Sequence, residues 1–163
     1  MFGRPKAASG LFLSQEVGRG MEIIGSTLER DHPDATSADF QTFCVWIYAV
    51  LIHIIMTHGR TDRNSLENVA YAFSSAMMQA PPEGRWSLDK YAEEIERCQQ
   101  LLIGNVGSNN WGGLREAAKA FHQRQVNQGE QLDVSEDDFV RIGSTIGMAW
   151  VQRLRESGHV KLR

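Results

Sequence analysis

The chain has few of the residue patterns by which the common enzyme and metal-binding classes are identified. Its 163 residues include two cysteines, which are too few for the disulfide framework of a small secreted protein. They include no Gly-x(4)-Gly-Lys-Ser/Thr phosphate loop and no His-x(3)-His zinc pair. We therefore expect no cofactor and no metal site. We expect Cys44 and Cys98 to be reduced thiols on buried helix faces.

Extremes of charge and hydropathy are also absent. The composition is 42% hydrophobic and 23% charged, which is ordinary for a globular domain and favours neither disorder nor a membrane protein. The formal net charge of −3 gives the chain as a whole no attraction to nucleic acid or to anionic lipid. The N-terminus lacks the run of about 7–15 apolar residues found in a signal peptide, so a cytoplasmic location is expected.

One apolar run dominates what is present. From Phe43 to Met56 every residue except His53 is apolar. A helix that is apolar on all of its faces must be surrounded by other elements. The run is shorter than the roughly 20 residues that a membrane span requires, so we expect no membrane contact. We interpret it as part of a helix over about 37–58, which forms the centre of a single-domain, all-α, six-helix bundle.

Apolar stripes at spacings of three and four residues predict the surrounding helices. No window shows the alternation of a strand followed by a hairpin turn. Capping residues mark where three of the helices begin. Thr36 or Ser37 caps the helix over 37–58, and Thr36 with Asp39 resembles a capping box. Ser87 and Ser135 cap two later helices.

The chain organisation follows from these boundaries. The third helix is expected to begin at Asn64, with Glu67 as its capping partner three residues later. Glycine, proline and serine over 1–10 predict a flexible N-terminal arm. A single helical domain is expected over 11–158, followed by a short basic tail over 159–163.

Several glycines fall inside the predicted helices. Gly143-x-x-x-Gly147, together with Gly25, would let helices approach one another closely. We expect this contact within one chain, and a dimer seam is the alternative. The tetrapeptide Ile-Gly-Ser-Thr occurs at 24–27 and again at 142–145, but no period runs through the chain, so it does not indicate a repeat.

Arg115 and His122 lie on one predicted helix with six residues between them. A histidine can transfer a proton near neutral pH, and an arginine can stabilise a charged phosphorane. The pair resembles the Arg-x(4–6)-His signature of HEPN ribonucleases, which are all-α and usually dimeric. The resemblance implies metal-independent RNA cleavage by Arg115 and His122 at a dimer interface. Glu116 stands where that family tends to carry a small polar residue.

The segment 104–113 is the most loop-like stretch of the chain, because it is rich in glycine and asparagine. It contains Asn109, Asn110 and Trp111. A tryptophan on a loop is a candidate anchor for a binding partner, since buried tryptophan often dominates the energy of an interface. The alternative is that Trp111 folds back onto the core.

Basic residues occur at both ends of the chain. The segment 3–6, Gly-Arg-Pro-Lys, resembles part of an AT-hook, with Phe2 where the hook carries an arginine. The resemblance implies insertion into a nucleic-acid minor groove. Together with Lys161 and Arg163, the segment would form a weak grip on a phosphate backbone.

These patterns favour a non-catalytic cytoplasmic protein that acts through helix and loop surfaces, with a protein partner or by self-association into a homo-oligomer. The candidate binding residues are Asn109, Asn110, Trp111, Arg115 and His122. Two alternatives remain open at this point. One is a HEPN-like ribonuclease that uses Arg115 and His122, and the other is a nucleic-acid-binding regulator that uses the basic termini.

Overall fold

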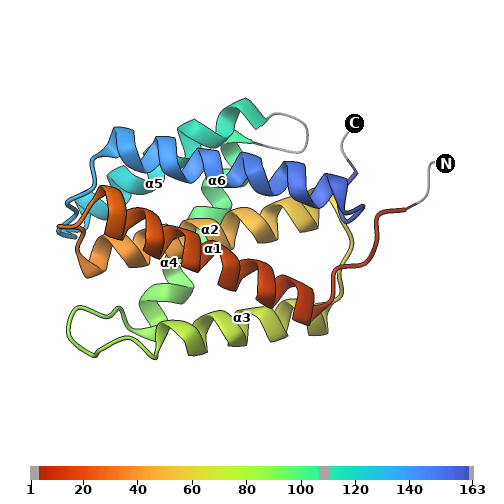
Figure 1. Ribbon diagram of the computed structural model, residues 1–163, viewed down its shortest axis with the longest axis horizontal. Helices are drawn as coiled ribbons and strands as arrows, with labels where there is room; N and C mark the ends of the chain where they lie inside the picture. The colour runs from red at the N-terminus through yellow and green to blue at the C-terminus, as the bar shows by residue number, and fades with distance from the viewer. Residues whose placement is uncertain (1–3, 107–110, 162–163) are drawn as a thin grey trace.

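The computed structural model describes residues 4–106 and 111–161, and within these ranges the chain is all-α, with six helices and no strand. Figure 1 shows one bundle with α3 along its lower edge. The predicted six-helix fold is confirmed. The elements are α1 (Gly10–Asp31), α2 (Ser37–His58), α3 (Arg63–Met77), α4 (Leu88–Asn105), the short 3-10 turn η1 (Trp111–Gly113), α5 (Leu114–Asn127) and α6 (Glu136–Glu156).

The apolar helix α2 is the centre of the bundle. Every residue from Phe43 to Ile55 is buried, and the helix packs against α1, α4, α5 and α6. By length and composition alone α2 is apolar enough to cross a membrane, but 83% of its most apolar window is buried inside the structure. Such burial is the arrangement expected of a core helix, so the prediction of a surrounded apolar helix over 37–58 is confirmed.

Local hydrogen bonds fix where the helices begin. The Asp39 amide donates to the Thr36 hydroxyl, and the Thr36 amide donates to the Asp39 carboxylate, so the predicted capping box is present. Ser87 and Ser135 each accept a hydrogen bond from the main-chain amide three residues later. The three predicted caps are therefore confirmed.

The predicted start of α3 is wrong. The helix begins at Arg63, and the Asp62 carboxylate caps it by accepting the Ser65 amide at 2.7 Å. Glu67 forms an ion pair with Arg63 instead of bonding back to a cap. Asp62 and Asn64 are both good capping residues, so the sequence alone did not decide between them.

The helices do not all pack against one another. Helix α3 packs on α1, and α4 packs on α2 and α5, while α6 packs on α5 and α2. Helices α3 and α4 are consecutive in the chain, yet they lie on different neighbours and diverge from each other. A strip of α2 between them is therefore covered by side chains rather than by a helix.

Glycines on α6 allow close packing within the chain. A Cβ at Gly143 would lie 2.8 Å from Nε1 of Trp46, and one at Gly147 would lie 2.8 Å from Cδ2 of Leu114. The predicted intrachain contact is thus confirmed for these two positions. The prediction for Gly25 is wrong, because an added Cβ there meets nothing within 4 Å.

The same role on α1 belongs to Gly20 rather than Gly25. An added Cβ at Gly20 would lie 2.6 Å from Cζ2 of Trp150 on α6. Helix α1 contains four glycines, and only their positions relative to α6 distinguish the one that contacts it.

The two ends of the chain meet the loop that joins α2 to α3. The Lys6 amide donates to the Gly158 carbonyl, and the Ala8 amide donates to the Arg60 carbonyl. The Lys161 amide donates to the carbonyl of His58. Figure 1 shows both termini at the same end of the bundle.

Candidate functional site

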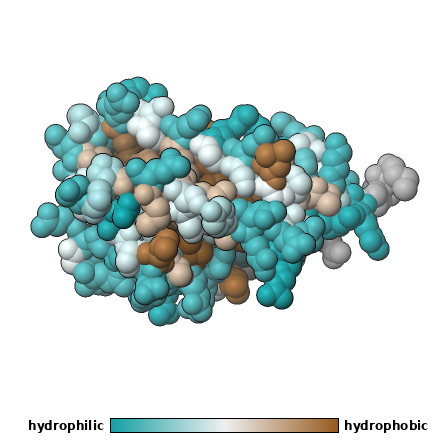
Figure 2. Space-filling model, turned by 90° about the horizontal axis from the view of Figure 1, so that it is seen from below, coloured by the Kyte–Doolittle hydropathy of each residue, from teal (hydrophilic) through white to brown (hydrophobic). Residues whose placement is uncertain are grey.

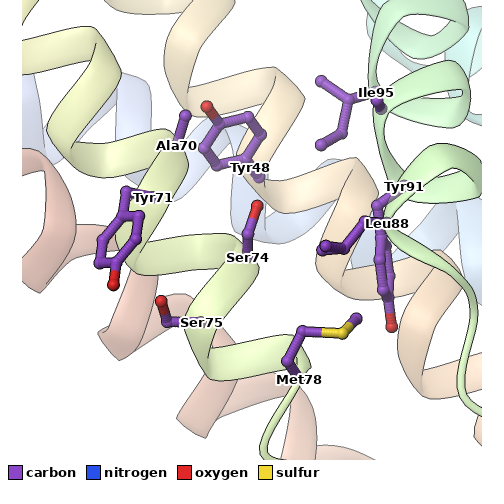
Figure 3. Close-up of a pocket in the computed structure, with 10 residues that line it drawn as sticks. Tyr48, Ala70, Tyr71, Ser74, Ser75, Met78, Leu88, Tyr91 and Ile95 are labelled. Carbon is purple, nitrogen blue, oxygen red and sulfur yellow. The ribbon is translucent and has the colours of Figure 1, made fainter.

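An apolar groove of about 610 Å³ lies where α3 and α4 diverge over α2. Its floor is the central helix and its walls are α3 and α4, so the groove is a direct result of the packing described above. Figure 3 shows its lining side chains. They are Tyr48, Ala70, Tyr71, Ser74, Ser75, Met78, Leu88, Tyr91, Ala92 and Ile95.

Aromatic packing makes the floor rigid. The Tyr48 ring stacks on Phe73 with 4.6 Å between centroids, and Phe73 meets Tyr91 edge-on at 6.2 Å. Tyr91 also packs against Trp86 with 5.5 Å between ring centroids, which forms a hydrophobic staple, and its hydroxyl donates to the Gln41 side chain. The floor is therefore held by interlocked rings rather than by mobile side chains.

The groove contains hydroxyl groups that stay neutral. Burial raises the pKa of Tyr48 to about 12 and that of Tyr91 to about 12, so both remain protonated near neutral pH. The other polar lining groups are the hydroxyls of Tyr71, Ser74 and Ser75. Since no lining residue is His, Cys, Asp, Glu, Lys or Arg, the groove has no side chain suited to acid–base or nucleophilic work near neutral pH.

Large apolar side chains stand exposed at the mouth of the groove. Tyr71 is 77% exposed and Leu88 is 54% exposed, one on each wall. Figure 2 views the molecule from the side of α3 and shows hydrophobic side chains at the surface among hydrophilic ones. An open concave apolar surface of this kind is typical of a binding site.

Acidic side chains flank the groove. Glu67 lies one helical turn before Tyr71 on α3, and Asp89 and Glu96 follow the lining residues Leu88 and Ile95 on α4. All three carboxylates are on exposed residues. Asp89 and Glu96 are seven residues apart and so share one side of α4. Because Glu67 is paired with Arg63, the negative charge beside the groove comes mainly from Asp89 and Glu96 on the α4 edge.

The structure describes only part of the set of residues that the sequence marked as a binding site. Asn109 and Asn110 lie outside the described residues, and Trp111 begins the turn η1. Arg115 is exposed on α5, whereas His122 is buried on the same helix. Neither Arg115 nor His122 lines the groove between α3 and α4.

His122 has the environment of a core residue. Its Nε2 lies 3.0 Å from the Val134 carbonyl oxygen, and its ring packs 5.3 Å from that of Phe139. Its Nδ1 is buried and has no hydrogen-bond partner among the described residues. A histidine held in this way cannot exchange a proton with a ligand at the surface beside Arg115.

Two Glu-x-x-His spacings, which the sequence analysis passed over, also fail to form a site. Such spacings supply ligands in di-iron helical bundles. Glu29 and His32 lie at the end of α1, where His32 Nε2 is 3.6 Å from Asp138, while Glu156 and His159 lie at the opposite end of α6. In the described part of the chain, no group of three or more His, Cys, Asp or Glu side chains could hold a metal ion.

The two basic ends do come together. Through the hydrogen bonds of Lys6 and Lys161, both termini lie beside the loop that carries Arg60. Arg4 belongs to the same N-terminal segment, and all four of these basic residues are exposed. The remaining residues of the predicted grip, Gly3 and Arg163, lie outside the described part of the chain.

Sequence reasoning missed the groove. Tyr71 is one position away from the apolar stripe of α3, which includes Val69, Ala70 and Phe73, and a single off-stripe tyrosine is not a distinctive signal. Only the exposure of Tyr71 and Leu88 on facing helices would have marked the site.

Comparisons of the chain with protein-family models, with curated proteins and with solved structures find no match.

Proposed function

We propose that the protein is a non-catalytic interaction module whose groove between α3 and α4 receives the apolar face of an amphipathic helix from a protein partner. The observation that carries this proposal is the exposure of Tyr71 and Leu88 at the mouth of an open apolar groove. Binding would remove both side chains from water, which contributes about 25 cal/mol per Å² of apolar surface buried.

The size of the groove suits side chains rather than a whole polypeptide fold. A volume of about 610 Å³ holds several leucine-sized groups, which an amphipathic helix presents at spacings of three, four and seven residues. The hydroxyls of Ser74 in the wall and of Tyr48 in the floor orient the partner by hydrogen bonding. The groove thus combines a rigid apolar floor with a few polar groups.

Charge specifies the partner further. Because Glu67, Asp89 and Glu96 border the groove, the favoured helix carries lysine or arginine beside its apolar face. The chain as a whole has a formal charge of −3, which adds to this preference. Pairing with the same groove of a second copy would bring like-charged carboxylates together, which disfavours that arrangement.

A pair of synthetic peptides tests the proposal. The probe is an amphipathic helix of about 16 residues with leucines on one face and lysines on both sides of it. The control peptide carries glutamate in place of each lysine. Isothermal titration calorimetry is expected to show binding of the lysine peptide, weakening at high salt, and at least about tenfold weaker binding of the glutamate peptide.

Matched variants show where the peptide binds. Leu88→Ser and Tyr71→Ser should each weaken binding about tenfold, because each removes apolar surface from the mouth of the groove. Ile103→Ser is the control, since Ile103 is 66% exposed on the same helix as Leu88 but does not line the groove. Equal losses in all three variants would refute the groove as the docking site.

Self-association stays a prediction from the sequence, as does the cytoplasmic location. Light scattering after size-exclusion chromatography distinguishes the 18.3 kDa monomer from integer multiples. A homo-oligomer that Leu88→Ser dissociates, and that Ile103→Ser leaves intact, would replace the partner helix by a second copy of the chain. A monomer at all concentrations would leave the partner-helix proposal in place.

The two nucleic-acid alternatives have unequal support. The burial of His122 removes the geometric basis for cleavage by Arg115 and His122, so the ribonuclease is not favoured. The meeting of the basic termini beside Arg60 favours a nucleic-acid-binding regulator as a second candidate. Binding of a duplex that falls steeply with salt, and that Arg4→Ser with Lys6→Ser abolishes, would support it; binding unaffected by these changes would refute it.

A further inference from the structure

A second pocket, of about 390 Å³, lies between the start of α5 and the middle of α6. It shares no residue with the groove between α3 and α4. We call it the arginine pocket. Its lining residues are Gly112, Leu114, Arg115, Arg141, Ser144, Thr145 and Met148.

The charge in the arginine pocket is entirely positive. Arg115 and Arg141 line it, and no Asp or Glu does. The side chain of Arg115 forms neither an ion pair nor a hydrogen bond with any other described residue. Arg141 has an exposed ion pair with Asp138, at 3.3 Å, and a surface pair of this kind is readily exchanged for a ligand. The guanidinium of Arg115 is thus free to meet an anion, and that of Arg141 can do so by exchanging its pair with Asp138.

A buried hydroxyl in the wall has no partner. Ser144 is only 7% exposed, and its Oγ forms no hydrogen bond within the described residues. It lies three residues after Arg141 on α6, so the two side chains occupy one face of the helix. Thr145, by contrast, already donates its hydroxyl to the Arg141 carbonyl. A buried hydroxyl usually has a partner. The Ser144 Oγ has almost no exposed surface, so a ligand oxygen in the pocket would reach it only after the side chain rotates toward the pocket.

The start of α5 adds to the positive potential. The helix has 14 residues and begins at Leu114 after Gly113, which has no side chain to cap it. The first amides of a helix and its dipole both favour an anion at this end. Leu114 and Met148 contribute apolar surface to the same pocket.

We propose that the arginine pocket binds the phosphate group of a small phosphomonoester. Arg115 and Arg141 pair with the phosphate oxygens, because a guanidinium matches a phosphate with two parallel hydrogen bonds. After a side-chain rotation, the Ser144 hydroxyl donates to a third oxygen. Met148, which is 46% exposed, contacts the apolar part of the ester, which inorganic phosphate lacks. This site is independent of the docking groove, so either proposal can fail without the other.

Amide spectra of the protein labelled with nitrogen-15 test the site directly. Phenyl phosphate, inorganic phosphate and phenol are titrated separately. Phenyl phosphate is expected to shift the amides of Leu114 and Ser144, to bind more tightly than inorganic phosphate and to weaken as salt is added. Phenol alone is expected to leave these amides unchanged at the same concentrations.

Four variants locate the contacts. Arg115→Gln and Arg141→Gln are each expected to weaken phenyl phosphate binding about tenfold or more. Ser144→Ala should also weaken binding, yet it should leave the unliganded fold as stable or more stable, because it removes an unpartnered hydroxyl. The control is Arg63→Gln, on α3, whose side chain is exposed and outside the pocket. Circular dichroism verifies that each variant is folded.

Three outcomes would overturn the proposal. The first is the absence of amide shifts in the arginine pocket at millimolar phenyl phosphate. The second is equal affinity in the wild type and in both arginine variants. The third is binding of a single-stranded RNA oligonucleotide through these residues without any binding of phenyl phosphate, which would assign the pocket to a macromolecule instead.

Discussion

The two Ile-Gly-Ser-Thr segments should respond in opposite ways to the same substitution. An alanine at Gly25 on α1 meets no atom within 4 Å. An alanine at Gly143 on α6 places its Cβ 2.8 Å from Nε1 and 3.0 Å from Cδ1 of Trp46. Trp46 is completely buried and packs against Phe121 and Phe139, so its ring has no free space into which it can move.

The magnitudes follow from two competing effects. Replacing glycine by alanine inside a helix gains up to about 1 kcal/mol, mostly by reducing the entropy of the unfolded chain. Gly25→Ala should therefore raise the free energy of unfolding by about 0.5–1 kcal/mol. At Gly143 the same gain is opposed by overpacking, and a net loss of about 1–2 kcal/mol is expected. In a domain of this size these changes shift Tm by about 2–4 °C per kcal/mol.

Urea denaturation followed by far-ultraviolet circular dichroism measures both variants. Each is compared with the wild type at the same temperature and pH, and Gly25→Ala is the matched control for Gly143→Ala. The two free energies of unfolding should differ by about 1.5–3 kcal/mol. If Gly143→Ala is as stable as Gly25→Ala, then Trp46 has room to move and the inferred close contact between α6 and α2 is wrong.

Three further predictions concern buried polar groups. Asp39→Ala should lower the free energy of unfolding, measured by urea denaturation, by about 3–4 kcal/mol. The reason is that Asp39 accepts hydrogen bonds from Thr36 and from the amides of residues 133 and 134. A loss below about 1 kcal/mol would contradict this. Burial opposes ionisation of Glu94, but hydrogen bonds and charge from Arg124 outweigh it and hold its pKa below the ordinary value. The ionised form therefore stabilises the fold above the unfolded pKa of about 4.3, and this stability is lost as the pH falls through the lower folded pKa. Urea midpoints between neutral and acid pH should show this loss, and Glu94→Gln should lessen it. Burial raises the pKa of the thiols of Cys44 and Cys98, so Ellman's reagent should react with them only after unfolding.

The central helix and most helix starts could be predicted from the sequence because their causes are local. The run from Phe43 to Met56 is apolar on every face, so a helix formed by it must be surrounded by other helices of the bundle. The caps at Thr36, Ser87 and Ser135 depend only on residues within one turn. The start of α3 was missed because two good caps lie two residues apart.

The binding surfaces could not be predicted because they arise from tertiary packing. The groove exists because α3 follows α1 while α4 follows α2, and no local pattern encodes that divergence. The burial of His122 depends on the segment before α6, whose Val134 carbonyl covers the ring. Arg115 and His122 are seven residues apart and so point to nearly the same side of α5. Arg115 is exposed because it lies near the start of the helix, away from the segment that covers His122.

The hydrogen bonds from Lys6 to Gly158 and from Lys161 to His58 hold the two ends of the described chain together without a covalent bond. Ordering one end lowers the entropy that must be lost to order the other, so segments about 150 residues apart fold and fray together. A short covalent bridge across this junction would therefore restrict the unfolded chain far more than the folded one. If the two ends were joined covalently, the loop between α3 and α4 would be the suitable place for new chain termini.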